Sequence, residues 1–242
     1  MIREFEGIIV SETAYSESSK IINILTKEDG IIGVMAKGAK RIKSPLRVAT
    51  ERFTLGVFNV YYHKDKLSTL VSADIINPLL NIKTDIMKIG YLTYIVELAY
   101  QTAKQNGDRA IYSILKSAIL KIEEGLNPMV ITNILELKML DYLGVGIDLD
   151  KCIKCGNTKN ILTISGDEGG YICSDCRTNE IIYNEKTIKM FRLYYYVDIN
   201  SITDLKISDE VIENINRILT EYYDRFTGLY LKSKEFLKSV SG

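Results

Sequence analysis

Residues 20–36 read KIINILTKEDGIIGVMA. Two runs of β-branched and aliphatic residues, 21–25 and 31–35, stand on either side of Asp29-Gly30. An Asp-Gly pair between two apolar runs is a strong hairpin signal. Further runs of the same type occur nearby, at residues 8–10, 53–62 and 67–71. The N-terminal part therefore predicts about five short strands.

About five strands within the first 80 residues, with a long basic connection after the third, favour a small closed barrel of the OB type. An SH3-like barrel is the alternative. The apolar period changes after Asn77-Pro78, where Ile86, Ile89 and Leu92 recur at helical spacing. We therefore expect two domains: an OB-fold-like domain at 1–80 and a helical domain at 81–242. Further helices are predicted at 108–124, 127–144, 185–196 and after Ser208.

The composition gives no global electrostatic argument for a nucleic-acid or membrane partner. The 242 residues are 46% hydrophobic, and 31 basic side chains balance 31 acidic ones. The apolar runs fall short of the ~20 residues that a membrane span needs. The start of the chain does not resemble a signal peptide. We expect a cytoplasmic protein in which any functional charge is local.

Four cysteines form the clearest motif. They occur as two C-x2-C pairs, Cys152 with Cys155 and Cys173 with Cys176. The separation of the pairs is typical of a zinc site, and four thiolates complete a tetrahedron that leaves no position for water. The pattern predicts one structural Zn²⁺ in a module at about 150–180. A redox pair or four free thiols are the alternatives.

A run of cations follows the third predicted strand. No acidic residue occurs between residues 37 and 47, which hold Lys37, Lys40, Arg41, Lys43 and Arg47. Glycine, serine and proline within the run disfavour a regular helix or strand, so the cations can follow a phosphate backbone. A solvated loop without a specific role is the alternative. Four aromatic residues offer possible stacking faces for bases, although strand aromatics are more often core: Phe53, Phe58, Tyr61 and Tyr62.

No catalytic pattern emerges from the residues. His63 is the only histidine, so Ser-His and Cys-His pairs are nearly excluded. The chain also lacks a phosphate-binding glycine loop. We therefore predict a protein that is not an enzyme.

The order of these parts resembles the RecO family of bacterial recombination mediators. The resemblance covers essentially the whole chain. It rests on residues 18–26 with Gly30 and Val34, on the run 36–41 with Lys43-Ser44, on Leu143-Gly144 before the first cysteine pair, on both pairs, and on residues 231–237.

The resemblance implies an N-terminal OB-fold and a helical C-terminal part with a zinc module. It also implies a DNA repair protein that binds single- and double-stranded DNA, anneals complementary strands and, with RecR, helps RecA replace single-strand-binding protein. Its partners would include RecR and the C-terminal tail of single-strand-binding protein, at the bacterial nucleoid. Lys232 and Lys234 lie in the matching C-terminal segment as possible further contacts to DNA or to a partner.

Two rival functions stay open at this point. One is a zinc-ribbon adaptor that binds only proteins. The other is an enzyme that uses the barrel cleft and an unrecognised carboxylate, for which no acid–base pair is evident.

Overall fold

A computed structural model describes residues 1–241. Its N-terminal part is a closed five-stranded barrel in the order β1-β2-β3-β5-β4, with β4 pairing back onto β1. The strands and one short helix have the following bounds: β1 (Ile2–Ala14), β2 (Lys20–Thr26), β3 (Gly30–Ala36), α1 (Leu46–Ala49), β4 (Leu55–Tyr61) and β5 (Ser68–Asn77). This is the predicted OB-fold.

Helices follow the barrel, and a small second sheet interrupts them in chain order. Their bounds are α2 (Leu80–Lys83), α3 (Ile86–Gln105), α4 (Ala110–Glu123), α5 (Pro128–Tyr142), α6 (Glu185–Tyr196), the 3₁₀ helix η1 (Ile199–Ser201), α7 (Asp209–Phe226) and α8 (Lys232–Ser241). In the sequence, the second sheet comes between α5 and α6. It has the order β6-β8-β7, with β6 (Asp148–Cys152), β7 (Ile161–Ser165) and β8 (Gly170–Cys173). The predicted combination of a β barrel with a helical part is confirmed.

Strand β1 carries apolar side chains on both of its faces, and each face packs against a different core. Phe5 and Ile9 belong to the core inside the barrel. Ile8 and Val10 point the other way and join the core of the helices, because successive side chains of a strand face opposite sides. Both faces of β1 are therefore buried at residues 7–10, and the barrel shares apolar surface with the helical part.

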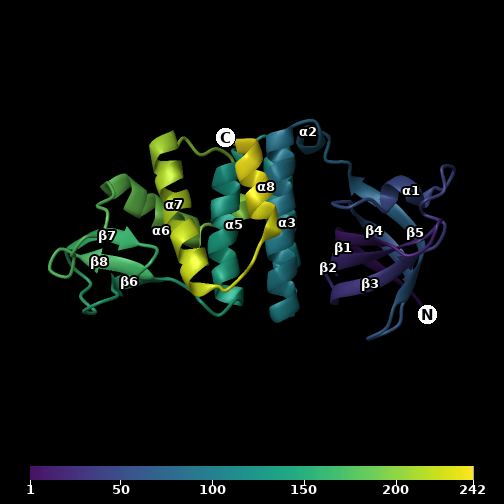
Figure 1. Cartoon of the computed structure of the whole chain (residues 1–242), viewed down its shortest axis with the longest axis horizontal. Coiled ribbons are helices and arrows are strands. Elements are labelled where there is room, and N and C mark those ends of the chain that lie inside the picture. Colours follow the sequence, from purple (N-terminus) through teal and green to yellow (C-terminus); the bar gives the residue numbers. More distant parts are fainter. Residues whose placement is uncertain (242) are drawn as a thin grey trace.

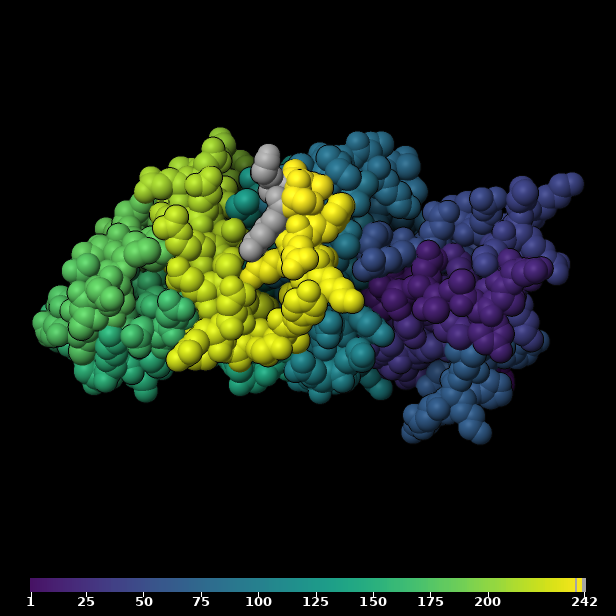
Figure 2. Space-filling view, in the orientation of Figure 1, coloured from purple at the N-terminus to yellow at the C-terminus, as the bar shows by residue number. Residues whose placement is uncertain are grey.

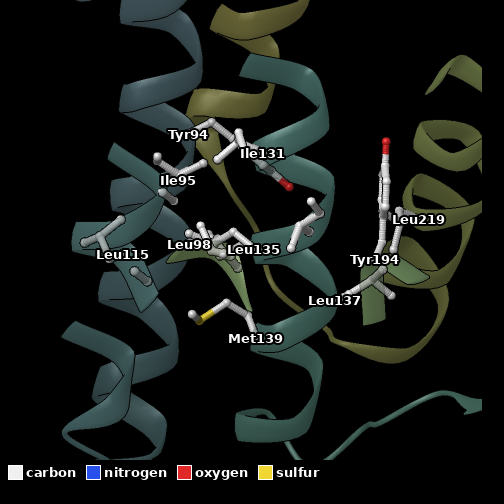
Figure 3. Close-up of a cluster of buried hydrophobic side chains, with 14 of the residues drawn as sticks. Tyr94, Ile95, Leu98, Leu115, Ile131, Leu135, Leu137, Met139, Tyr194 and Leu219 are labelled. Atoms are coloured by element: carbon white, nitrogen blue, oxygen red, sulfur yellow. The ribbon is translucent and has the colours of Figure 1, made fainter. Parts of the chain in front are cut away.

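Helix α5 is the central helix of the C-terminal part. Asn127 caps it by accepting hydrogen bonds from the backbone N–H groups of Met129 and Val130. Every residue from 130 to 137 is buried, so the helix has no solvent-facing side there. Figure 3 shows α5 side chains among those of α3, α4, α6 and α7.

Figure 1 shows the barrel at one end of an elongated molecule and β6–β8 at the other, with the helices between them. The space-filling view in Figure 2 has the same layout, with the green surface of the small sheet far from the purple surface of the barrel. Across residues 1–241, each helix is too short or too polar to cross a membrane.

Candidate metal centre and nucleic-acid interface

The four cysteines come together at one end of the small sheet. Cys152 is the last residue of β6 and Cys173 the last residue of β8, and both are fully buried. Cys155 and Cys176 follow in the two turns after these strands and are more exposed. The three strands around the cysteines were not predicted from the sequence.

The sulfur geometry fits a tetrahedral metal ion. All four Sγ atoms lie within 4.8 Å of one another, and the Sγ atoms of Cys155 and Cys173 are 3.7 Å apart. A Zn–S bond of about 2.3 Å gives a tetrahedron whose S–S edge is about 3.8 Å. The backbone N–H of Cys173 donates to Sγ of Cys152 over 3.4 Å. These four thiols can therefore hold a metal ion.

The thiols also compete with one another for negative charge. Burial opposes ionisation of Cys152, but hydrogen bonds from the backbone N–H groups of Cys173, Cys155 and Lys154 lower the pKa of Cys152 to about 6. The neighbouring thiols Cys155 and Cys173 raise the pKa of Cys176 to about 12. Four thiolates so close together need a positive ion between them, because like charges disfavour joint ionisation.

Residues 37–47, called the basic segment below, connect β3 to α1 and lie against the turn between β1 and β2. Gly38 adopts a left-handed φ of 69°, which favours glycine there, and its N–H donates to Oγ of Ser19. The backbone N–H of Lys40 donates to the carbonyl of Ser18 over 3.0 Å. These bonds fix the start of the basic segment on the barrel.

The five predicted cations differ in their contacts within the protein. Lys40 Nζ donates to the carbonyl of Ser16 over 2.9 Å, so this side chain is partly used within the protein. The other four are exposed, and in the part of the chain that the structure describes none of them forms a salt bridge: Lys37, Arg41, Lys43 and Arg47. Unpaired cations on one short segment are available to an anionic partner.

A groove of about 680 Å³ runs between the basic segment and β5. One wall carries Lys37, Arg41 and Lys43, with Ser44, Pro45 and Leu46. The other wall consists of residues 71–74 of β5. This second wall was not predicted, because the apolar run of β5 ends at Val71 and the edge of the strand forms only once the barrel is assembled.

The aromatic residues are less accessible than a stacking role requires. Phe58 is fully buried in the barrel core, which excludes stacking on bases and agrees with the core alternative for strand aromatics. Phe53 packs against the helical core, and Arg3 covers the ring of Tyr62 at 4.6 Å from its centroid. Tyr61, at 50% exposure, is the most accessible of the four.

Lys232 and Lys234 lie at the start of α8, on the helical part, and not with the basic segment (Figure 1). Lys234 forms a salt bridge of 3.0 Å with Asp224 of α7. The carboxylate of Glu97 in α3 accepts the backbone N–H groups of Lys232 and Ser233. The structure therefore does not bring these two lysines together with the five cations of the barrel.

Comparison with known proteins shows the family to which this chain belongs. Residues 1–79 match the family "Recombination protein O N terminal", and residues 83–235 match "Recombination protein O C terminal". A DNA repair protein RecO of Listeria monocytogenes serotype 4b is 34% identical over 239 residues, covering 97% of this chain and 93% of the relative. That of Halalkalibacterium halodurans is 31% identical over 244 residues, covering 99% and 96%. With both matches spanning nearly its full length, this chain belongs to the RecO family of DNA repair and recombination proteins.

Proposed function

We propose that this protein is a recombination mediator that binds single- and double-stranded DNA, anneals complementary strands and, with RecR, helps load RecA onto DNA coated by single-strand-binding protein. The observation that carries the proposal is the set of four unpaired cations on the basic segment. Membership of the RecO family supports it. The protein would act in the bacterial cytoplasm at the nucleoid.

The chemistry of this role needs no bond cleavage. Lysine and arginine neutralise phosphates and release condensed counterions, so affinity falls as salt rises. Phosphate contacts position a strand without reading its bases. Two strands whose charges are neutralised can approach each other, and base pairing then supplies the driving force. We therefore propose that the protein has no catalytic residues.

We propose that the four cysteines hold one Zn²⁺ with a structural role, since their tetrahedral arrangement leaves no position for a reacting water. When bound, the ion would supply the positive charge that four thiolates require. It would join the ends of β6 and β8 at the far end of the molecule from the barrel. The zinc module would then belong to a unit at 81–242, distinct from the DNA-binding unit at 1–80.

The proposal of further partners is supported by the family resemblance. We propose RecR and the C-terminal tail of single-strand-binding protein as protein partners, with RecA reached indirectly. Lys232 and Lys234 are a possible second contact. Lys232 is the more available of the two, because Lys234 already forms a salt bridge with Asp224.

The test is a fluorescence-anisotropy titration of the full chain with labelled single-stranded DNA across a salt series. The variant is Arg41→Ala with Lys43→Ala. Lys64→Ala with Lys66→Ala is the matched control, because these lysines are also exposed on the barrel. We expect the slope of log affinity against log salt to fall by about 1.4 in the variant alone, at ~0.7 per lost phosphate contact.

Equal affinity and equal slope in the variant and the wild type would remove the basic segment from the DNA site. Saturable binding should be similar for unrelated DNA sequences, since phosphates are the contacted groups. If the folded wild type binds no DNA even at low salt, the protein-only adaptor becomes the better account.

A further inference from the structure

Strand β5 has one edge that is paired over only part of its length. On one side it pairs with β4 from Thr69 to Asn77. On the other side it pairs with β3 only through Ser68 and Thr69. Within residues 1–241, no strand pairs with that second edge from Leu70 onward. The barrel is therefore closed at one end of β5 and open along the rest.

The short helix α1 packs against β5, but the open edge lacks the other usual protections against strand addition. Native sheets often blunt an edge with proline, lysine or inward charges. Residues 70–77 contain no proline and one charged side chain, Asp74. Three β-branched residues on this stretch are more than 40% exposed: Val71, Ile75 and Ile76. Such a stretch is a template for another extended chain.

The wall opposite this edge indicates what kind of chain fits. Lys37, Arg41 and Lys43 face the groove of about 680 Å³, against the one carboxylate of Asp74. The β5 wall presents Val71, Ser72 and Ala73 and no aromatic ring. A site for unpaired bases would be expected to offer stacking faces. A strand edge beside cations instead suits backbone hydrogen bonding together with acidic side chains.

We propose that the groove between the basic segment and β5 receives an extended acidic segment of a partner protein, which pairs with the open edge of β5 and places its carboxylates against Lys37, Arg41 and Lys43. The segment extends the barrel sheet by one strand. A further consequence rests on the function proposed above. DNA phosphates and the acidic segment use the same cations, so the two ligands displace each other.

The experiment uses the full chain and no DNA in its first arm. The probe is a fluorescein-labelled peptide that alternates glutamate with valine. One control peptide replaces each valine with proline, which keeps the charge and removes backbone donors. A second control peptide replaces glutamate with lysine. Binding is followed by anisotropy, and amide hydrogen exchange locates the bound peptide.

We expect the alternating peptide to bind and to slow amide exchange at residues 70–76. The proline and lysine peptides should bind about tenfold more weakly or worse. Arg41→Glu with Lys43→Glu should weaken the alternating peptide by a similar factor. Lys64→Glu with Lys66→Glu changes the net charge equally on the same barrel and should have little effect.

Three results would overturn the proposal. The first is no binding of the alternating peptide by the folded wild type. The second is equal binding of the proline peptide without protection of residues 70–76, which would mean that the cations attract any polyanion. The third is protection of these amides by an oligothymidine but not by the peptide, which would assign the groove to nucleic acid. DNA binding is measured in a separate arm, so its failure leaves the peptide result interpretable.

Discussion

The phenol of Tyr94 donates a hydrogen bond of 2.5 Å to Oε1 of Glu136 inside the helical core. Tyr94 belongs to α3 and Glu136 to α5, and both side chains are buried. The second oxygen, Oε2, has no hydrogen-bond partner among the residues that the structure describes. Burial raises the pKa of Glu136 to about 7, although the bond from Tyr94 and the charge of Lys234 act in the opposite direction.

This carboxyl predicts a loss of stability as pH rises. The folded state keeps the proton up to about pH 7, whereas the unfolded chain releases it near pH 4.5. The free energy of unfolding therefore falls between these values. Glu136→Gln keeps an acceptor for Tyr94 and removes the charge. We expect it to stabilise the protein by about 3 kcal/mol at about pH 8.

Urea unfolding at about pH 6 and about pH 8 checks this prediction. The Glu136→Gln variant should show the weaker pH dependence. Glu213→Gln, on an exposed face of α7, is the control and should behave like the wild type. An unchanged pH profile in Glu136→Gln would mean that Glu136 titrates normally.

Loss of one buried cysteine should release the metal and loosen the small sheet. Cys173→Ser removes a thiolate at the end of β8, where the proposed structural zinc would supply folding free energy. We expect one zinc per chain in the wild type and a large loss of zinc in the variant. Amide exchange should become faster at residues 148–173 and stay unchanged in the barrel. Ser174→Ala, in the same turn, should keep its zinc.

Gly166 should not tolerate a side chain. A Cβ there would lie 2.3 Å from the carbonyl oxygen of Ile218 and 2.7 Å from Cβ of Glu221, both in α7. Gly166→Ala must move the turn after β7 away from that helix, at a cost of about 1–3 kcal/mol. Gly107→Ala has no atom within 4 Å of the new Cβ and should be nearly neutral. Thermal unfolding of both variants decides the point, and equal melting temperatures would contradict it.

Glu97 should stabilise the start of α8. Its carboxylate accepts the N–H of Ser233 over 2.8 Å and that of Lys232 over 3.3 Å. Glu97→Ala leaves both donors without this acceptor and should cost about 1 kcal/mol. Exchange of the two amides should become faster, with Glu97→Gln intermediate. Unchanged exchange in Glu97→Ala would show that water replaces the carboxylate without loss.

The barrel was predictable because its strands follow the apolar pattern. The run Ile8-Ile9-Val10 predicted a strand, and β1 extends beyond it on both sides because its polar ends pair with β2 and β4. Helix α6 has the predicted bounds. Ser208 was correctly placed before α7, but its hydroxyl accepts no capping bond.

The small sheet was not predictable in the same way. β6 contains Asp148, Asp150 and Lys151, so no apolar run marks it, and its position depends on bringing the cysteines together. The basic segment was evident from composition. The sequence could not show which of its cations lack a partner within the protein. The hydrogen bond from Lys40 to Ser16 exists only after β1, β2 and β3 have assembled.

The apolar surface that β1 shares with the helices bears on how this protein could have been inherited. Ile8, Val10, Leu25 and Leu55 of the barrel lie in the same core as α3 and α4. A barrel separated from its helices would expose these four side chains to water and be prone to aggregate. A domain that is exchanged between genes folds without a particular neighbour. The outer surface of this barrel instead packs against α3 and α4. Recombination within the gene between its two halves would expose apolar surfaces that are buried against each other here.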